Sequence, residues 1–186
     1  MDHHTFDAGR ADRLEDAAAR YRRFSAEELL WALELTGEET VADLGSGTGF
    51  YTDDVAAHAG QVLAVDVQPA MHEHYREKGV PANVDLVTAD LAALPASVAD
   101  VDAALSTMTF HEFATDAALA ELADAVVPGG RLVVGDWSAE GDGESGPPLD
   151  ERYALEAATS KLAAAGFERR FGASRPETFL LVAERV

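Results

Sequence analysis

The amino-acid sequence predicts an α/β fold in which an open, mostly parallel sheet carries helices on both faces. Short apolar runs alternate with helical patterns from residue 38 onward, a spacing that favours parallel strands joined by right-handed crossovers. A glycine-rich turn, Gly45-Ser-Gly-Thr-Gly49, follows the first apolar run and opens the next helix. Such turns bind nucleosides at the carboxyl ends of parallel strands.

Each predicted element follows from a local pattern. Residues 10–23 read as a charged helix, and residues 25–35 as a second helix that Gly37 stops. Pro69 suits the first turn of a later helix. The predicted strands and helices of the sheet region are strands at 40–44, 61–65, 84–87, 100–106, 131–136, 167–171 and 178–184, and helices at 50–58, 69–78, 115–126 and 151–165.

The glycine turn and two aspartates predict a site for an adenine nucleoside. Asp43 ends the first strand, and Asp66 ends the second, where a carboxylate can accept hydrogen bonds from ribose hydroxyls. The glycines let the backbone turn tightly and leave room for a ligand. Phe50 stands where the dinucleotide fingerprint needs its third glycine, and Asp43 would repel a pyrophosphate. Asp43 would instead attract a sulfonium or an amino group, which argues against a nicotinamide cofactor.

Five motifs in order resemble the class I S-adenosylmethionine (SAM)-dependent methyltransferases. The likeness covers roughly residues 38–186. Residues 43–49 are similar to motif I, and residues 62–66 to the ribose-binding strand. Residues 88–91 are similar to the adenine-contacting position, residues 101–112 to the fourth strand with its loop, and residues 127–132 to the Pro-Gly-Gly turn.

The resemblance implies a Rossmann-like, seven-stranded sheet of order 3-2-1-4-5-7-6 with its last strand antiparallel. It implies one methyltransferase domain over residues 1–186, with a helical lid segment at 1–37 and a SAM-binding core at 38–186. The implied cofactor is SAM, with S-adenosyl-L-homocysteine as product. The residues expected to bind it are Asp43, Gly45, Ser46, Gly47, Gly49, Asp66, Val67, Asp90, Leu91 and Thr107.

His111 and Asp136 are the predicted catalytic residues. A histidine has a reference pKa of ~6.5, which suits removal of a proton from an acceptor near neutrality. Glu112 is a neighbouring carboxylate that could orient His111, and a packing role for His111 stays open. Trp137 and the Gly/Pro-rich stretch 138–149 are expected near the acceptor, with that stretch closing as a lid.

The expected acceptor is a small molecule. The likeness within the family is to small ubiquinone/menaquinone-biosynthesis-type methyltransferases, which does not supply an acceptor. No Asn-Pro-Pro-Tyr follows the fourth strand, which weakens a DNA-base or amide acceptor. Two other functions stay open: a SAM-binding module that has lost catalysis, and, on weaker grounds, an NAD-dependent oxidoreductase.

The net charge restricts the expected binding partners and cellular environment. The chain has 34 acidic and 14 basic residues, a formal net charge of −20, which disfavours nucleic acid and anionic membranes. Because salt shortens screening to ~3 Å at 1 M, we interpret this acidity as adaptation to a high-salt cytoplasm, as in halophilic archaea. The sequence shows no apolar run of membrane-spanning length and no signal-peptide pattern, so a cytoplasmic protein is expected, and a homodimer stays open.

No metal site is expected. The chain has no cysteine, which removes thiolate ligands. His72 and His74 are two positions apart on a predicted helix and do not share a face. His3 and His4 stand near the first residue.

Overall fold

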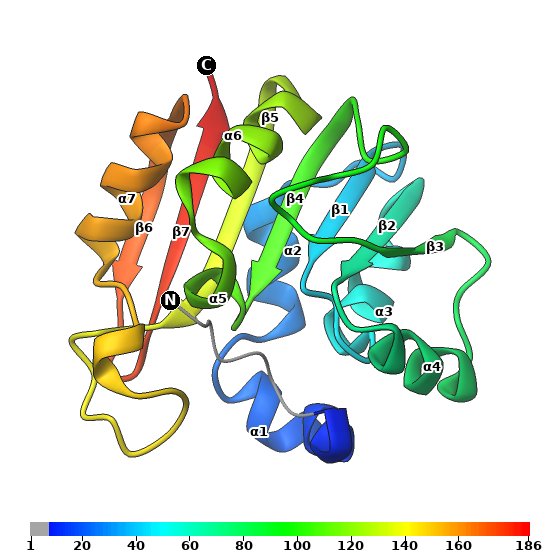
Figure 1. Ribbon diagram of the computed structural model, residues 1–186, viewed down its shortest axis with the longest axis horizontal. Helices are drawn as coiled ribbons and strands as arrows, with labels where there is room; N and C mark the ends of the chain where they lie inside the picture. The colour runs from blue at the N-terminus through cyan, green and yellow to red at the C-terminus, as the bar shows by residue number, and fades with distance from the viewer. Residues whose placement is uncertain (1–7) are drawn as a thin grey trace.

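The computed structural model describes residues 8–186, so His3 and His4 lie outside the described residues. These residues form one seven-stranded sheet of order β3-β2-β1-β4-β5-β7-β6 (Figure 1). β7 runs antiparallel to both of its neighbours and the other pairs are parallel, as expected. The strands are β1 (Thr40–Leu44), β2 (Gln61–Asp66), β3 (Val84–Thr88), β4 (Val101–Thr107), β5 (Val126–Trp137), β6 (Phe167–Ser174) and β7 (Thr178–Arg185).

Helices cover both faces of the sheet. The helical elements are η1 (Ala8–Glu15), α1 (Ala17–Tyr21), α2 (Ala26–Leu33), α3 (Phe50–Ala56), α4 (Pro69–Lys78), α5 (Phe110–Phe113), α6 (Asp116–Ala125), η2 (Leu149–Glu151) and α7 (Leu155–Ala164). One buried cluster joins α2, α3 and α4 to the sheet through Leu29, Val55 and Tyr75. A second cluster joins α6 and α7 to the opposite face through Leu119 and Leu162. The sheet therefore has a hydrophobic core on each side.

The amino-terminal helices differ from the sequence prediction. The expected helix at 10–23 is broken into the 3-10 helix η1 and the short helix α1. The break falls at Asp16, whose side chain accepts a hydrogen bond from Ala19 N at 3.1 Å and so caps α1 instead of continuing a helix. α2 ends before Gly37, because Glu34 already adopts a left-handed conformation with φ of 53°.

Two elements near the end of the chain begin at other places than expected. β5 starts at Val126, ahead of the predicted residue 131, because Val126 pairs with Val101 and the Pro-Gly-Gly segment stays within the strand. α7 starts at Leu155 rather than at residue 151, where the 3-10 helix η2 lies instead. Neither shift changes the sheet order.

β6 is the outermost strand beside β7 and carries an irregularity. Its pairing register shifts between Arg169 and Phe171, which leaves Arg170 out of the ladder, as in a β-bulge. The Arg170 guanidinium forms ion pairs with Glu168 at 3.1 Å and with Glu184 at 3.0 Å. β6 also extends to Ser174, beyond the predicted residue 171.

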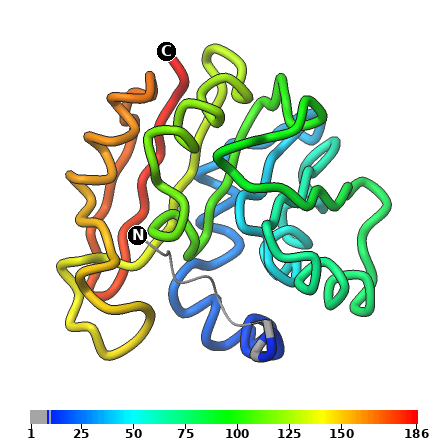
Figure 2. Tube along the Cα trace, in the orientation of Figure 1, coloured from blue at the N-terminus to red at the C-terminus, as the bar shows by residue number. Residues whose placement is uncertain are grey.

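The carboxyl ends of the parallel strands meet at the lower edge of Figure 1, beside α1. The Cα trace carries the first described residues along the same edge as the loop that follows β5 (Figure 2). Open α/β sheets bind ligands at this edge. Within residues 8–186 we find no helix that is both long and apolar enough to cross a membrane.

Candidate active site

The glycine turn after β1 is tied to the end of β2. Gly45 N and Ser46 N both donate hydrogen bonds to Val65 O, at 2.8 and 3.0 Å. Gly45, Gly47 and Gly49 all have positive φ, at 74°, 56° and 80°, which is the conformation that glycine adopts without strain. The backbone of the turn is therefore held in one shape before a ligand arrives.

Side chains from other parts of the chain fill much of the space beside the glycines of the turn. A Cβ at Gly45 would lie 2.3 Å from Thr109 Cγ2, and a Cβ at Gly49 would lie 2.2 Å from the Tyr75 ring. Only at Gly47 is there more space, since its nearest neighbour, Leu14 Cδ1, would be 3.3 Å away. Two of the three glycines thus allow Thr109 and Tyr75 to pack against the turn.

Asp66 connects the second strand to the glycine turn. Its Oδ2 accepts from Gly47 N and its Oδ1 from Gln68 N, both at 2.8 Å. Each carboxylate oxygen keeps a second lone pair that a hydroxyl donor could use. Asp66 is buried, whereas Val67, the next residue, is 53% exposed.

Asp43 lies beneath the turn and is almost fully buried. Its Oδ2 accepts from Thr52 Oγ1 at 2.6 Å, but its Oδ1 has no hydrogen-bond partner among the described residues. Burial raises the pKa of Asp43 to about 6, and the bond from Thr52 and attraction to Arg20 limit the rise. A buried carboxylate oxygen without a donor is costly, which points to a ligand donor.

Arg20 of α1 lies near Asp43. Its guanidinium lies 4.6 Å from the Tyr51 ring centroid and 5.4 Å from that of Phe50. Burial lowers the pKa of Arg20, while Tyr51 and Asp43 work in the opposite direction. Arg20 Nε and Ser46 Oγ are also buried without a hydrogen-bond partner in the described chain. Asp43 and Arg20, which attract one another, therefore each have a buried polar atom without a hydrogen-bond partner among the described residues.

Thr107 and the loop after β4 reach the glycine turn. Thr107 is 5% exposed, and Met108 N donates to Gly135 O at 2.7 Å. Thr109 Oγ1 lies 3.1 Å from Thr107 O and 3.4 Å from Gly45 O. The ends of β1, β4 and β5 are thereby joined at one point.

The predicted residues Asp90 and Leu91 lie further out, after β3. Asp90 is exposed, and its Oδ1 accepts from Ala92 N at 2.9 Å. Leu91 packs partly against the core cluster on the α6 face. The described contacts of both residues therefore stay local and do not reach the glycine turn.

His111 and Asp136 form a buried pair at the other end of this edge. His111 lies in α5, a short helix that the sequence patterns did not predict. Its Nδ1 is 2.9 Å from Asp136 Oδ1 and its backbone N donates to Asp136 Oδ2 at 2.7 Å. Trp137 N also donates to Asp136 Oδ1, at 2.7 Å. Asp136, not Glu112, orients the imidazole; Glu112 Oε1 is 3.8 Å from His111 Nε2.

The environment of the pair shifts two pKa values upward. For His111, burial is the largest single influence and lowers the pKa, but the hydrogen bond and charge of Asp136, with Glu112 and Glu151, outweigh it and raise the pKa. Burial raises the pKa of Glu112 to about 7, opposed by His111. Glu112 therefore exchanges its proton close to neutrality, and His111 holds its proton more tightly than a free imidazole does.

The amino-terminal segment crosses the glycine turn. Thr48 Oγ1 donates to the Glu15 carboxylate, and Lys78 Nζ lies 3.4 Å from Glu15 and 2.9 Å from Asp53. The predicted lid at 138–149 has other contacts: Arg152 binds Pro147 O at 2.8 Å, and a Cβ at Gly146 would lie 2.5 Å from the Trp137 indole. That loop is held on Trp137, rather than on the glycine turn.

Four side chains that bear on the site were not predicted: Arg20, Thr52, Tyr75 and Thr109. No sequence motif marks them, because each reaches the turn only through folding. The clearest available signal was the run of basic residues at 20, 22 and 23, in a chain with few basic residues.

Comparison with known proteins agrees with this geometry. Residues 41–130 match a methyltransferase-domain family. The structure superposes on a SAM-dependent methyltransferase of Aquifex aeolicus with a TM-score of 0.87 and 29% identity, covering 98% of this chain and 100% of that one.

The chain therefore carries a methyltransferase domain at residues 41–130 and has the fold of the class I SAM-dependent methyltransferases. Its cofactor is accordingly SAM, rather than a nicotinamide dinucleotide. An uncharacterized methyltransferase-like protein of Schizosaccharomyces pombe is 36% identical over 93 residues, which are 50% of this chain and 36% of that protein. A demethylmenaquinone methyltransferase of Corynebacterium kroppenstedtii is 36% identical over 101 residues, 54% of this chain and 42% of the relative. This methyltransferase chain thus spans about two fifths of the length of these two relatives.

Proposed function

We propose that this protein transfers a methyl group from SAM to a small-molecule acceptor, with His111 as the proton acceptor. The observation that carries the proposal is the buried His111–Asp136 pair at the same sheet edge as the glycine turn. A pure binding module has no need of an oriented imidazole at this place. SAM, when bound, supplies a methyl group on a sulfonium whose leaving group is a neutral thioether.

The residues around the turn fit that cofactor. Asp66 offers lone pairs for ribose hydroxyls, beyond the bonds from Gly47 N and Gln68 N. Asp43 Oδ1, buried and without a donor, suits an ammonium, and the buried guanidinium of Arg20 suits a carboxylate. The amino and carboxylate groups of a methionine moiety would satisfy these two side chains at once. Asp90 and Leu91, one strand further out, stay proposed contacts of the adenine.

The geometry of the pair decides which nitrogen of His111 can take a proton. An ionised Asp136 is an acceptor only, so Nδ1 of a neutral His111 must be the nitrogen that donates to it. Nε2 then carries the free lone pair, and it stands 3.8 Å from Glu112 Oε1. His111 Nε2 is therefore the proposed base for an acceptor hydroxyl or amine, and Asp136 is a positioning residue that holds its tautomer.

A small-molecule acceptor is supported by relatives and by charge. One relative is named as a demethylmenaquinone methyltransferase, which makes a quinol or phenol the first acceptor class to test. The net charge of −20 disfavours nucleic acid.

Calorimetry and methyl-transfer assays test the proposal. The protein should bind SAM and S-adenosylhomocysteine in molar potassium chloride, and no heat of binding would refute the cofactor assignment. A panel of quinols, phenols and amines should include a substrate whose methylation is lost in His111→Gln, while SAM binding persists. SAM binding with no turnover on any member would favour the binding module instead.

A further inference from the structure

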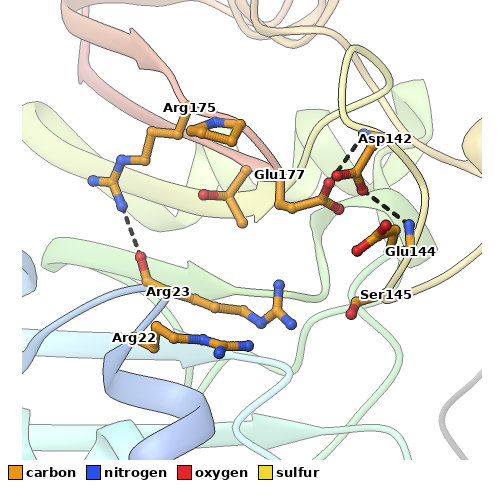
Figure 3. A pocket seen from close by; sticks show the side chains of 9 residues that line it. Arg22, Arg23, Asp142, Glu144, Ser145, Arg175 and Glu177 are labelled. Carbon is orange, nitrogen blue, oxygen red and sulfur yellow. Dashed lines mark hydrogen bonds between the residues drawn. The ribbon is translucent and has the colours of Figure 1, made fainter.

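A hollow lies on the side of the molecule where β5 and β7 meet, and Thr178, which pairs with Trp137, is part of its lining. It has a volume of about 330 Å³ and sits between the end of α1, the turn joining β6 to β7 and the loop after β5 (Figure 3). Its charged lining comes from segments far apart in the sequence: Arg22, Arg23, Arg175, Asp142, Glu144 and Glu177.

The arginines that line the hollow differ in whether they form ion pairs. Arg175 is paired with Glu28 and also donates to Arg23 O at 2.7 Å. The side chains of Arg22 and Arg23, by contrast, form no ion pair with any residue between 8 and 186, although acidic residues outnumber basic ones more than twofold. Figure 3 shows the two guanidiniums extending in the same direction, towards the loop that carries Ser145.

Two of the acidic side chains that line the hollow accept hydrogen bonds from the backbone of the loop after β5. Asp142 Oδ1 accepts from Glu144 N at 3.0 Å, and Glu177 Oε1 accepts from Asp142 N at 2.9 Å. Glu177 Oε2 is 3.6 Å from Arg152 Nη1. Asp142 and Glu177 are thus engaged with the loop, whereas the side chains of Arg22, Arg23 and Glu144 form no hydrogen bond or ion pair among the described residues.

The arginines are held close to like charges. Arg23 lies 4.1 Å from the Trp137 ring centroid, and the buried Arg152 lies 5.3 Å from the same centroid. Burial, followed by repulsion from Arg22, lowers the pKa of Arg23, while attraction to Glu177 opposes this shift. Two guanidiniums with free donors that repel one another are the usual components of an oxyanion site.

Two residues, Trp137 and Asp136, connect Arg23 of the hollow to the proposed base His111. Trp137, under Arg23, donates its backbone N–H to Asp136, which in turn holds His111. A group fixed by the arginines would therefore belong to a molecule that can also reach the reaction centre.

We propose that Arg22 and Arg23 bind an oxyanion group, a carboxylate or a phosphate, of the methyl acceptor. This inference rests on the proposed methyltransferase function and names the chemistry of its acceptor. Each arginine can donate two parallel hydrogen bonds to such a group.

Tryptophan fluorescence tests the inference directly. The chain has two tryptophans, so Trp31→Phe leaves Trp137 as the sole reporter. In that background, benzoate or phenyl phosphate should change the emission saturably, and benzamide, of the same shape without the charge, should not. Comparing benzoate with phenyl phosphate shows which oxyanion the hollow prefers.

Charge-matched variants complete the experiment. Arg23→Gln and Arg22→Gln should each weaken oxyanion binding by about tenfold, the loss expected for a charge-assisted pair of hydrogen bonds. Arg76→Gln, which removes the same charge from an exposed position on α4, should change nothing. Equal binding of benzamide and benzoate, or unchanged binding in both arginine variants, would overturn the inference.

SAM calorimetry on the same proteins separates the two proposals. All three arginine variants should bind SAM like the parent. If the parent binds SAM but no oxyanion saturates the hollow, the inference fails and the methyltransferase proposal stands. If the parent does not bind SAM, the proposed function fails, whatever the oxyanions do.

Discussion

The glycine-turn half of the site is assembled from near neighbours in the sequence, whereas the half around Trp137 draws on distant segments. Asp43 and Asp66 lie on the adjacent strands β1 and β2, and Gly47, in the turn after β1, donates its backbone N–H to the Asp66 carboxylate. Arg23, Trp137 and Arg152 come from three separate parts of the chain. The first arrangement follows from strand–turn–helix geometry that every member of the fold needs, and the second depends on which side chains the surface loops bring together.

The largest expected effect tests how rigidly the local half is packed. Gly49→Ala should cost about 4 kcal/mol of unfolding free energy, because it adds a strained positive φ and a clash with the Tyr75 ring. Gly129 has the same φ of 80°, but a Cβ there would meet no atom within 4 Å, so Gly129→Ala should cost only about 1 kcal/mol. Urea denaturation measures both. Equal losses would mean that packing against Tyr75 contributes nothing.

Asp66→Ala should weaken SAM binding about a hundredfold, since it removes a charged acceptor from Gly47 N, Gln68 N and the ribose. Asp85→Ala is the matched control, because Asp85 is exposed on β3 and accepts from Gln61 Nε2. Titration calorimetry in molar potassium chloride compares them. Similar affinities for both variants would break the assignment of Asp66 to the cofactor.

The pH dependence of SAM binding sharpens the role of Asp43. With its pKa near 6 in the free protein, Asp43 should lose its charge as pH falls, and SAM affinity should drop about tenfold between pH 7 and pH 5. Asp43→Asn should show a flatter profile.

Asp43 also makes the opposite prediction for the stability of the ligand-free protein. The folded state holds this proton more tightly than the unfolded state, whose pKa is near 3.8. Raising the pH from about 4 to about 6 should therefore remove stability, and Asp43→Asn should reduce that slope. A wild-type slope retained in the variant would contradict the assignment.

The smallest expected effect concerns the half of the site around Trp137. Asp136→Asn should lower the pKa of His111, because Asp136 supplies the charge and hydrogen bond that raise it. Histidine proton resonances followed through a pH titration measure this shift. An unchanged His111 pKa would show that Asp136 only packs against the ring.

The sequence predicted the local half well for a physical reason. Strand periodicity and glycine spacing report the backbone directly, so the positions of Asp43 and Asp66 could be read from them, whereas the sheet order followed from the resemblance to the methyltransferase family. His111 and Asp136 were both singled out, but their contact could not be, since it depends on the short helix α5 packing against β5. Arg20 was missed because nothing in an amphipathic pattern shows that a guanidinium will turn inward.

The bulge on β6 bears on how this chain behaves at high concentration. An open sheet edge is a template for the strands of other molecules, and regular edges lead to fibrils. Here Arg170 leaves the ladder and is clamped between Glu168 and Glu184. An approaching strand would have to break both ion pairs and match an irregular backbone. These features of β6 disfavour pairing of this sheet edge with a strand of another molecule.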